Sequence, residues 1–130
     1  MAVISPTHAD HGSEAVIYTW VLTTADHTGA AIGPEVTSRF REITWHARGT
    51  WGGATAAAEG ANENTSAYFG PSKSADGGAA ITYTADAGTP AVQTAVPAYV
   101  RARLSVVGAG ATVTVTAYCT RQPFARGRIG

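Results

Sequence analysis

The chain of 130 residues carries little charge: Asp, Glu, Lys and Arg make up 14% of it, against about 25% in an ordinary soluble domain. It has a single cysteine, Cys119, which excludes an intramolecular disulfide and favours a reducing compartment. A membrane-spanning helix needs about 18 consecutive apolar residues, and no such run is present. The N-terminus lacks the basic and apolar regions of a signal peptide, so we expect synthesis in the cytoplasm.

Small residues take the place of the missing charges. Glycine accounts for 15 residues, Ala, Thr and Ser are frequent throughout, and hydrophobic residues make up an ordinary 45%. The length and composition fit one globular domain with its own core. A weakly charged surface of small residues suits a protein that packs against neighbours better than it suits a free enzyme.

The charges that are present are unevenly distributed, although the formal net charge is zero. Residues 1–90 hold all nine acidic residues and four basic ones, whereas residues 91–130 hold five arginines and no acid. A basic end can bind an acidic surface or a nucleic acid. A nucleic-acid interface needs a denser basic cluster with interleaved aromatic residues. We therefore expect a protein partner and no direct nucleic-acid contact.

Alternation of apolar and polar residues is the main structural signal, because successive strand side chains point to opposite faces. Residues 15–23 (AVIYTWVLT) form such a strand, and its Trp20 is expected in the core together with Trp45 of a later strand. Two alternating runs flank a glycine-rich turn near the end of the chain, which predicts a β-hairpin. Besides residues 15–23, the expected strands cover residues 39–48, 54–59, 66–69, 79–84, 92–95, 99–107 and 112–120.

About eight short strands, and no helix of ordinary length, predict an all-β fold. We expect an antiparallel β-sandwich, jelly-roll-like, over residues 14–120. Residues 1–13 and 121–130 lack periodicity and are expected to form extended N- and C-terminal arms.

Two segments resemble small structural proteins of tailed bacteriophage particles. The first, GTWGGATAAAEGANEN at residues 49–64, is similar to Gly-Thr-aromatic-Gly-Gly-Ala-Thr-x-x-x-Glu-Gly-x-Asn. The second, PAYVRARLSVVGAGATVTVTAYCTR at residues 97–121, is similar to Pro-x-Tyr-x-Arg followed by a glycine-rich turn and Thr/Val alternation. The chain departs from the family at Ala56 and Ala58, where the family strand usually carries Val or Leu.

The resemblance implies a capsid decoration, or cement, protein without enzymatic activity. Such proteins are β-sandwiches that sit as oligomers over junctions between subunits of the capsid shell. The expected partners are the major capsid protein and sister copies in a dimer or trimer, and the expected location is the virion surface. Two alternatives stay open: a phage tail or head–tail connector component, and a carbohydrate-binding module that uses Trp51 and Tyr68 as aromatic platforms.

Partner contacts are expected where aromatic residues and arginines are available, because these residues dominate interface energetics. Trp51 lies in a turn between glycines, and Arg101 and Arg103 share a strand face with Tyr99. The set of expected contact residues is Trp51, Tyr99, Arg101, Arg103, Arg121, Arg126 and Arg128.

No metal or cofactor site is expected. His8, Asp10 and His11 lie close together, but a zinc site needs further ligands at a fixed spacing, and neither His27 nor His46 supplies one. We interpret the histidine-containing segment as a polar arm.

No catalytic residues are expected either. Asp26 and His27 are accompanied by serines, but a nucleophile-elbow sequence is missing. Glu59 and Glu63 have the composition of a glycosidase pair, yet two carboxylates near one turn also arise by chance. Cys119 lies on the apolar face of its strand and is expected as a core residue.

Overall fold

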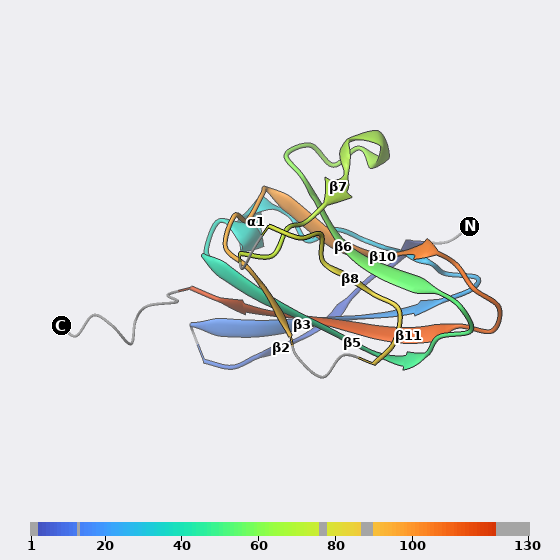
Figure 1. The fold of residues 1–130 in the computed structure, drawn as a ribbon. Coiled ribbons are helices and arrows are strands. Elements are labelled where there is room, and N and C mark those ends of the chain that lie inside the picture. Colours follow the sequence, from blue (N-terminus) through green and yellow to red (C-terminus); the bar gives the residue numbers. More distant parts are fainter. Residues whose placement is uncertain (1–2, 13, 76–77, 87–89, 122–130) are drawn as a thin grey trace.

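The computed structural model describes residues 3–12, 14–75, 78–86 and 90–121 of the chain. Its strands form two sheets that pack face to face and enclose one hydrophobic core (Figure 1). The fold is therefore all-β, as the sequence predicts. None of the helices in the described part of the chain is long and apolar enough to cross a membrane.

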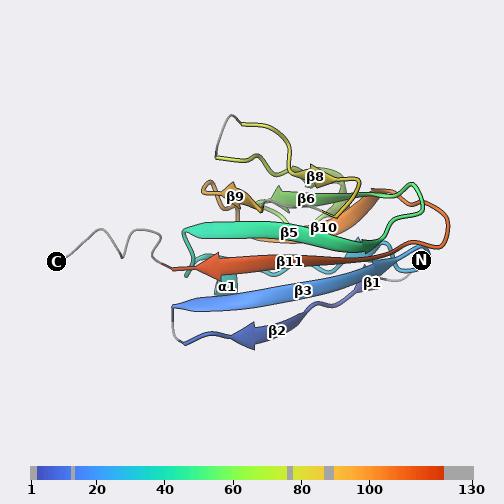
Figure 2. The same ribbon diagram turned by 60° about the horizontal axis from the view of Figure 1, so that its bottom comes forward.

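Each sheet combines strands from both ends of the chain (Figure 2). Sheet A has the order β1 (Val3–Ile4), β4 (Thr28–Gly29), β10 (Tyr99–Val106), β6 (Thr55–Ala61) and β7 (Gly70–Pro71), and β8 (Thr82–Tyr83) also pairs with β6. Sheet B has the order β2 (Thr7–Asp10), β3 (Ala15–Thr23), β11 (Thr112–Thr120), β5 (Glu42–Thr50) and β9 (Ala91–Gln93). The helical elements of the described residues are α1 (Pro34–Thr37) and the 3₁₀ turn η1 (Ser66–Tyr68).

The strand pairs are nested within the sequence. β3 pairs with β11, β4 with β10, β5 with β9, and β6 with β7, so early strands pair with late strands and the middle strands pair with each other. Among the described strands the chain changes sheet from β1 to β2, from β3 to β4, from β4 to β5, from β5 to β6, from β8 to β9, from β9 to β10 and from β10 to β11. The nested pairing thus places β10 and β11 at the centres of the two sheets.

The predicted hairpin of the last two strands is wrong, because β10 belongs to sheet A and β11 to sheet B. Both strands bury one face in the shared core, for example through Val100 and Leu104 on β10 and through Val113 and Val115 on β11. Alternation reports only that one face is buried. It is the same whether two strands pair side by side or face each other across a core.

The connection between β10 and β11 is held by hydrogen bonds to neighbouring turns. Thr24 Oγ1 donates to the carbonyl of Gly108 (3.1 Å) and accepts from the backbone N–H of Ala111 (3.0 Å). The N–H of Ala109 donates to the carbonyl of Gly52 (3.1 Å). Gly52 has φ +53°, and a Cβ there would meet the carbonyl oxygen of Ala109, so this contact requires glycine.

Two stacked tryptophans lie at the centre of the core, as predicted. The rings of Trp20 and Trp45 are fully buried, and their centroids are 5.8 Å apart. Each indole N–H has a partner, the carbonyl of Ala30 (2.9 Å) for Trp20 and Oε1 of Gln93 (2.8 Å) for Trp45. Cys119 is also buried, which confirms its predicted place in the core.

The N-terminal segment is extended, as expected of an arm, but residues 3–10 are part of the sandwich and not separate from it. β1 pairs with β4 in sheet A, and β2 pairs with β3 in sheet B. The segment therefore extends both sheets at one edge. The C-terminal arm expected after Arg121 lies outside the described residues.

Three predicted strands differ in the structure. Residues 66–69 form η1 and its C-cap instead of a strand, because local bonds from Tyr68 N–H to the Thr65 carbonyl (2.9 Å) and from Phe69 N–H to the Ser66 carbonyl (3.4 Å) close a turn. The strand expected from residue 39 begins at Glu42, after a turn that follows α1. The strand expected at residues 79–84 is reduced to β8.

Candidate functional site

A cleft of about 660 Å³ lies on the outer face of sheet A. Arg101 and Arg103 of β10 line it, together with residues 27–31 around β4 on one side and Phe69 after η1 on the other. The volume is within the range of about 300–1,000 Å³ that is usual for ligand pockets. The cleft is therefore large enough for a side chain or a short segment of a partner.

Strand register brings three charged side chains together beside this cleft. β6 and β10 are antiparallel neighbours in which Glu59 lies directly opposite Arg101. Val100, Ala102 and Leu104 of β10 point into the core. Because strand side chains alternate, Arg101 and Arg103 must point outward on the same face as Glu59.

Both arginines bind the same carboxylate. Arg101 donates a hydrogen bond from Nε to Oε1 of Glu59 (3.0 Å), and its Nη2 atom lies 2.9 Å from the same oxygen. Arg103 donates from Nε to both carboxylate oxygens (3.1 and 3.0 Å) and from Nη2 to Oε2 (2.8 Å). These are charge-assisted bonds, and the contact of Arg103 is bidentate.

The cluster is buried, although it lies on the outer face of a sheet. Glu59 is 5% exposed and Arg101 8% exposed, whereas the side chain of Arg103 remains 34% exposed toward the cleft. The hydrogen bonds to Glu59 raise the pKa of Arg103 above its ordinary value. Two guanidinium groups against one carboxylate leave a net charge of +1 at this position.

Phe69 covers the cluster from the solvent side. The guanidinium carbon of Arg101 lies 4.0 Å from the centroid of the Phe69 ring, which is cation–π geometry. The turn of η1 places Phe69 there, and Asn64 and Ser66 from the same segment also line the cleft. The segment that the sequence predicts as a strand is therefore a cover over the arginines.

The other expected contact residues are spread over the molecule. Tyr99 begins β10 and is half-buried near Gly33, and it does not line the cleft. Arg121 lies at the end of β11, where its N–H donates to the Glu14 carbonyl (2.9 Å), and it lines a smaller hollow of about 240 Å³ beside sheet B. Arg126 and Arg128 lie outside the described residues.

Trp51 is fixed in the turn between β5 and β6. Its indole N–H donates to Oδ1 of Asp86 (2.9 Å), which also accepts the backbone N–H of Gly49 (2.9 Å). The hydrogen bond from Trp51 is the main cause that lowers the pKa of Asp86. Tyr68 is exposed beyond the other end of β6, so the two aromatic residues do not form one platform.

The residues weighed for metal binding and catalysis have other contacts. Among the described residues, no three or more His, Cys, Asp or Glu side chains are grouped so that they could hold a metal ion. The rings of His8 and His11 lie against Tyr18 and Tyr118, with centroids 5.5 and 6.5 Å apart. Burial raises the pKa of the Cys119 thiol to about 12.

Sequence reasoning located two members of the cluster and missed their partners. The alternation predicts Arg101 and Arg103 on one strand face, but it does not pair them with Glu59, and it predicts a strand where Phe69 follows a turn. The contact between Glu59 and Arg101 depends on the register of β6 against β10, which local alternation does not specify.

No family model, curated protein or solved structure matches this chain.

Proposed function

We propose that the chain is a non-enzymatic structural subunit of a bacteriophage particle, a decoration protein that binds and stabilises the capsid shell. The proposal starts from the sequence resemblance and from the low charge of the chain. Its partners are the major capsid protein and sister copies in a homo-oligomer.

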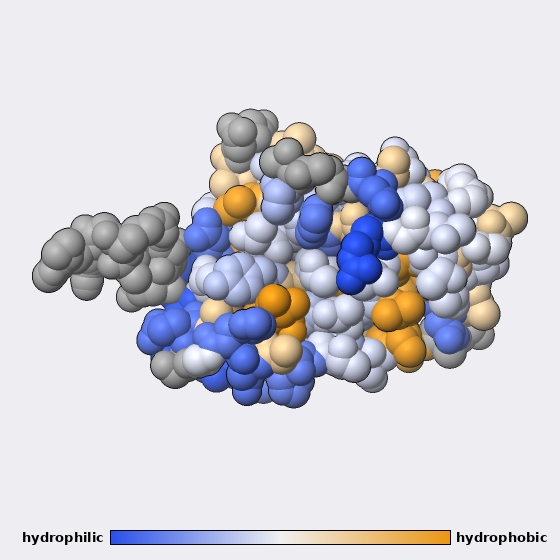
Figure 3. Space-filling view, turned by 90° about the horizontal axis from the view of Figure 1, so that it is seen from below, coloured by the Kyte–Doolittle hydropathy of each residue, from blue (hydrophilic) through white to orange (hydrophobic). Residues whose placement is uncertain are grey.

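The outer face of sheet B carries the proposal. The central strand β11 and its neighbour β3 present no charged side chain on this face, whereas β5, the other neighbour of β11, carries Glu42, His46 and Arg48 there. The outward positions of β11 are Thr112, Thr114, Thr116, Tyr118 and Thr120, and those of β3 include Ile17, Thr19 and Val21. In Figure 3 much of this face is pale, with small orange patches, and strongly hydrophilic groups in blue lie beside them. The uncharged surface along β3 and β11 can be desolvated against a protein at low cost, and the charges of β5 lie along one side of it.

The chain is large enough to provide a protein interface of standard size. A stable contact of standard size buries about 800 Å² on each partner. The chain exposes 6592 Å², so such a contact needs only about one eighth of its surface. Many equal contacts over a symmetric shell then gain strength through multivalency.

We further propose that the sandwich is a jelly roll built from eight strands, four in each sheet. The support is the nested pairing of β3 with β11, β4 with β10, β5 with β9, and β6 with β7. Such pairing arises when one long hairpin is rolled into two sheets. Jelly rolls occur in viral capsid domains and in lectins, so the fold is compatible with the proposed role and does not by itself select it.

The test is co-sedimentation with particles of the encoding phage that have been prepared without this protein. Val21→Glu places a charge on the outer face of sheet B. Val106→Glu is the matched control, because Val106 is a similarly exposed valine at the end of β10 in sheet A (45% and 53% exposed). Burial of an unpaired carboxylate is strongly unfavourable, so we expect Val21→Glu to weaken binding at least about tenfold and Val106→Glu to leave it unchanged.

Four outcomes contradict the proposal. The wild-type chain fails to bind particles, or both variants bind as the wild type does. Microscopy that locates the chain in a single ring or stack assigns it to the tail or connector instead. Saturable glycan binding that Trp51→Ala abolishes favours the carbohydrate-binding alternative.

A further inference from the structure

We infer that the cleft on sheet A binds a carboxylate presented by a partner protein, an aspartate or glutamate side chain that docks between Arg101, Arg103 and Phe69. The carboxylate site follows from the cleft itself, and only the identity of the partner as a capsid subunit rests on the proposed function.

The first argument is the charge balance. Arg101 and Arg103 share the single carboxylate of Glu59, and the residues that line the cleft include no Asp or Glu. One positive charge therefore has no counter-charge within the walls of the cleft. A partly buried charge without a partner is unfavourable, and an incoming anion removes that cost.

The second argument is the donor geometry. Glu59 accepts from Nε and Nη2 of both arginines. Within the described part of the chain, no acceptor engages Nη1 of either guanidinium group. The guanidinium group of arginine is planar and carries donors on Nε, Nη1 and Nη2. Because Glu59 holds Nε and Nη2 in place, the Nη1 donors are preorganised for a second oxyanion.

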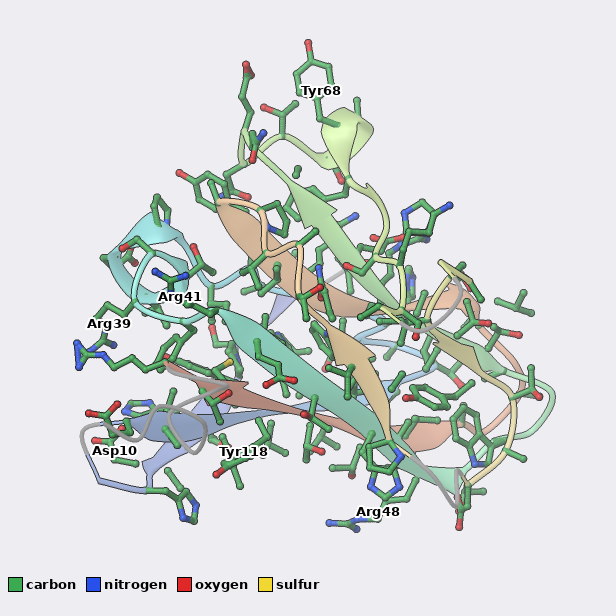
Figure 4. All side chains as sticks on the ribbon, turned by 60° about the vertical axis from the view of Figure 1, so that its left-hand side comes forward. Asp10, Arg39, Arg41, Arg48, Tyr68 and Tyr118 are labelled. Atoms are coloured by element: carbon green, nitrogen blue, oxygen red, sulfur yellow. The ribbon has the colours of Figure 1, made fainter. Side chains whose placement is uncertain are left out.

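The third argument selects a protein carboxylate over a nucleic-acid phosphate. A phosphate backbone is bound by a stripe of several basic residues. The exposed arginines Arg39, Arg41 and Arg48 lie on or next to sheet B and do not extend the charge of the cleft. Figure 4 shows them well away from Tyr68, which marks the position of η1 beside the cleft. The cleft thus offers one net positive charge with neighbouring polar and apolar groups, which suits one acidic side chain and its flanking residues.

The test is an NMR titration of the full chain that observes the arginine Nε–H signals. The probe is glutamate blocked at both ends, and the neutral reference is blocked glutamine, which has the same shape. We expect saturable shifts of the Arg101 and Arg103 signals with a Kd of the order of 10 mM for the glutamate probe, as one charge-assisted contact in a cleft provides. Blocked glutamine is expected to cause no saturable shift.

Two variants with opposite expected effects on the affinity for the glutamate probe make the test specific. Arg103→Gln leaves the Glu59–Arg101 pair intact and should weaken the glutamate probe at least about tenfold. Glu59→Gln adds a second uncompensated charge and should strengthen it several-fold. Arg48→Gln on sheet B removes the same charge from an exposed strand position and should have no effect.

Any of four results overturns the inference: no saturable shift, equal shifts with blocked glutamine, unchanged affinity in Arg103→Gln, or binding of inorganic phosphate without binding of the glutamate probe. The proposed function fails separately. Probe binding by a chain that never associates with particles refutes the structural role alone, whereas particle binding without probe binding refutes the cleft alone.

Discussion

Replacement of Glu59 by glutamine tests how the buried charge cluster contributes to stability. The substitution keeps the shape of the side chain and removes the charge that both arginines share. Removing one partner of a buried ion pair costs about 3–5 kcal/mol. Because the Arg103 side chain is 34% exposed, water partly stabilises that cation, and we expect a loss near the lower end, about 3 kcal/mol. This corresponds to a fall in Tm of about 10 °C.

The measurement is urea unfolding followed by tryptophan fluorescence, since Trp20 and Trp45 pass from full burial to solvent. Glu42→Gln is the control, because Glu42 is a half-buried strand residue in sheet B. We expect it to change the free energy of unfolding by less than about 0.5 kcal/mol.

A double variant separates loss of charge balance from loss of shape. Arg103→Gln in the Glu59→Gln background removes one of the two uncompensated cations. It should therefore recover about 1 kcal/mol instead of adding a further loss. A cost of Glu59→Gln below about 1 kcal/mol, as for a surface ion pair, refutes the reasoning. So does a double variant that loses the sum of the two single effects.

Three further predictions concern the turn, the thiol and the carboxylate outside this cluster. Gly52→Ala should destabilise the chain by more than about 2 kcal/mol. Gly53 also has positive φ but has open space at Cβ, so Gly53→Ala should cost about 1 kcal/mol. Equal losses in urea unfolding would contradict the close contact between Gly52 and Ala109. Cys119 should resist a thiol reagent in the native chain and react at once after unfolding, because it is buried and its pKa is raised to about 12; fast native labelling would show that the core is open there. The folded pKa of Asp86 is lowered, so its contribution is complete above its ordinary value of about 3.9 and is lost as the pH falls through the lower folded pKa. The difference in stability between the wild type and Asp86→Asn should accordingly shrink between about pH 5 and about pH 2, and a difference that does not change with pH would contradict the assignment.

The sequence was sufficient for the long central strands and for the core. β3 has the predicted bounds, and β11 likewise, because each buries one face and alternates along its whole length. The stacked Trp20 and Trp45 follow from the same pattern. Long, one-sided burial is the strongest local signal that a strand can give.

What the sequence could not provide was the pairing of strands. The connection between β10 and β11 has the composition of a hairpin turn, but it crosses between the sheets. β1, β4 and β7 have two residues each and exist only because a neighbour offers a free edge. The candidate cleft was missed for the same reason, since Glu59 meets Arg101 through register and Phe69 reaches Arg101 through a turn.

The outer face of sheet B is the surface on which the proposed function depends, and a side-chain-resolution reconstruction of the phage particle tests it most directly. We predict many copies over the capsid shell, each with Val21, Thr116 and Tyr118 against a shell subunit or a sister copy (Figure 4 shows Tyr118 on this face). A particle that lacks the chain, or that carries it with this face turned to solvent, would contradict the account.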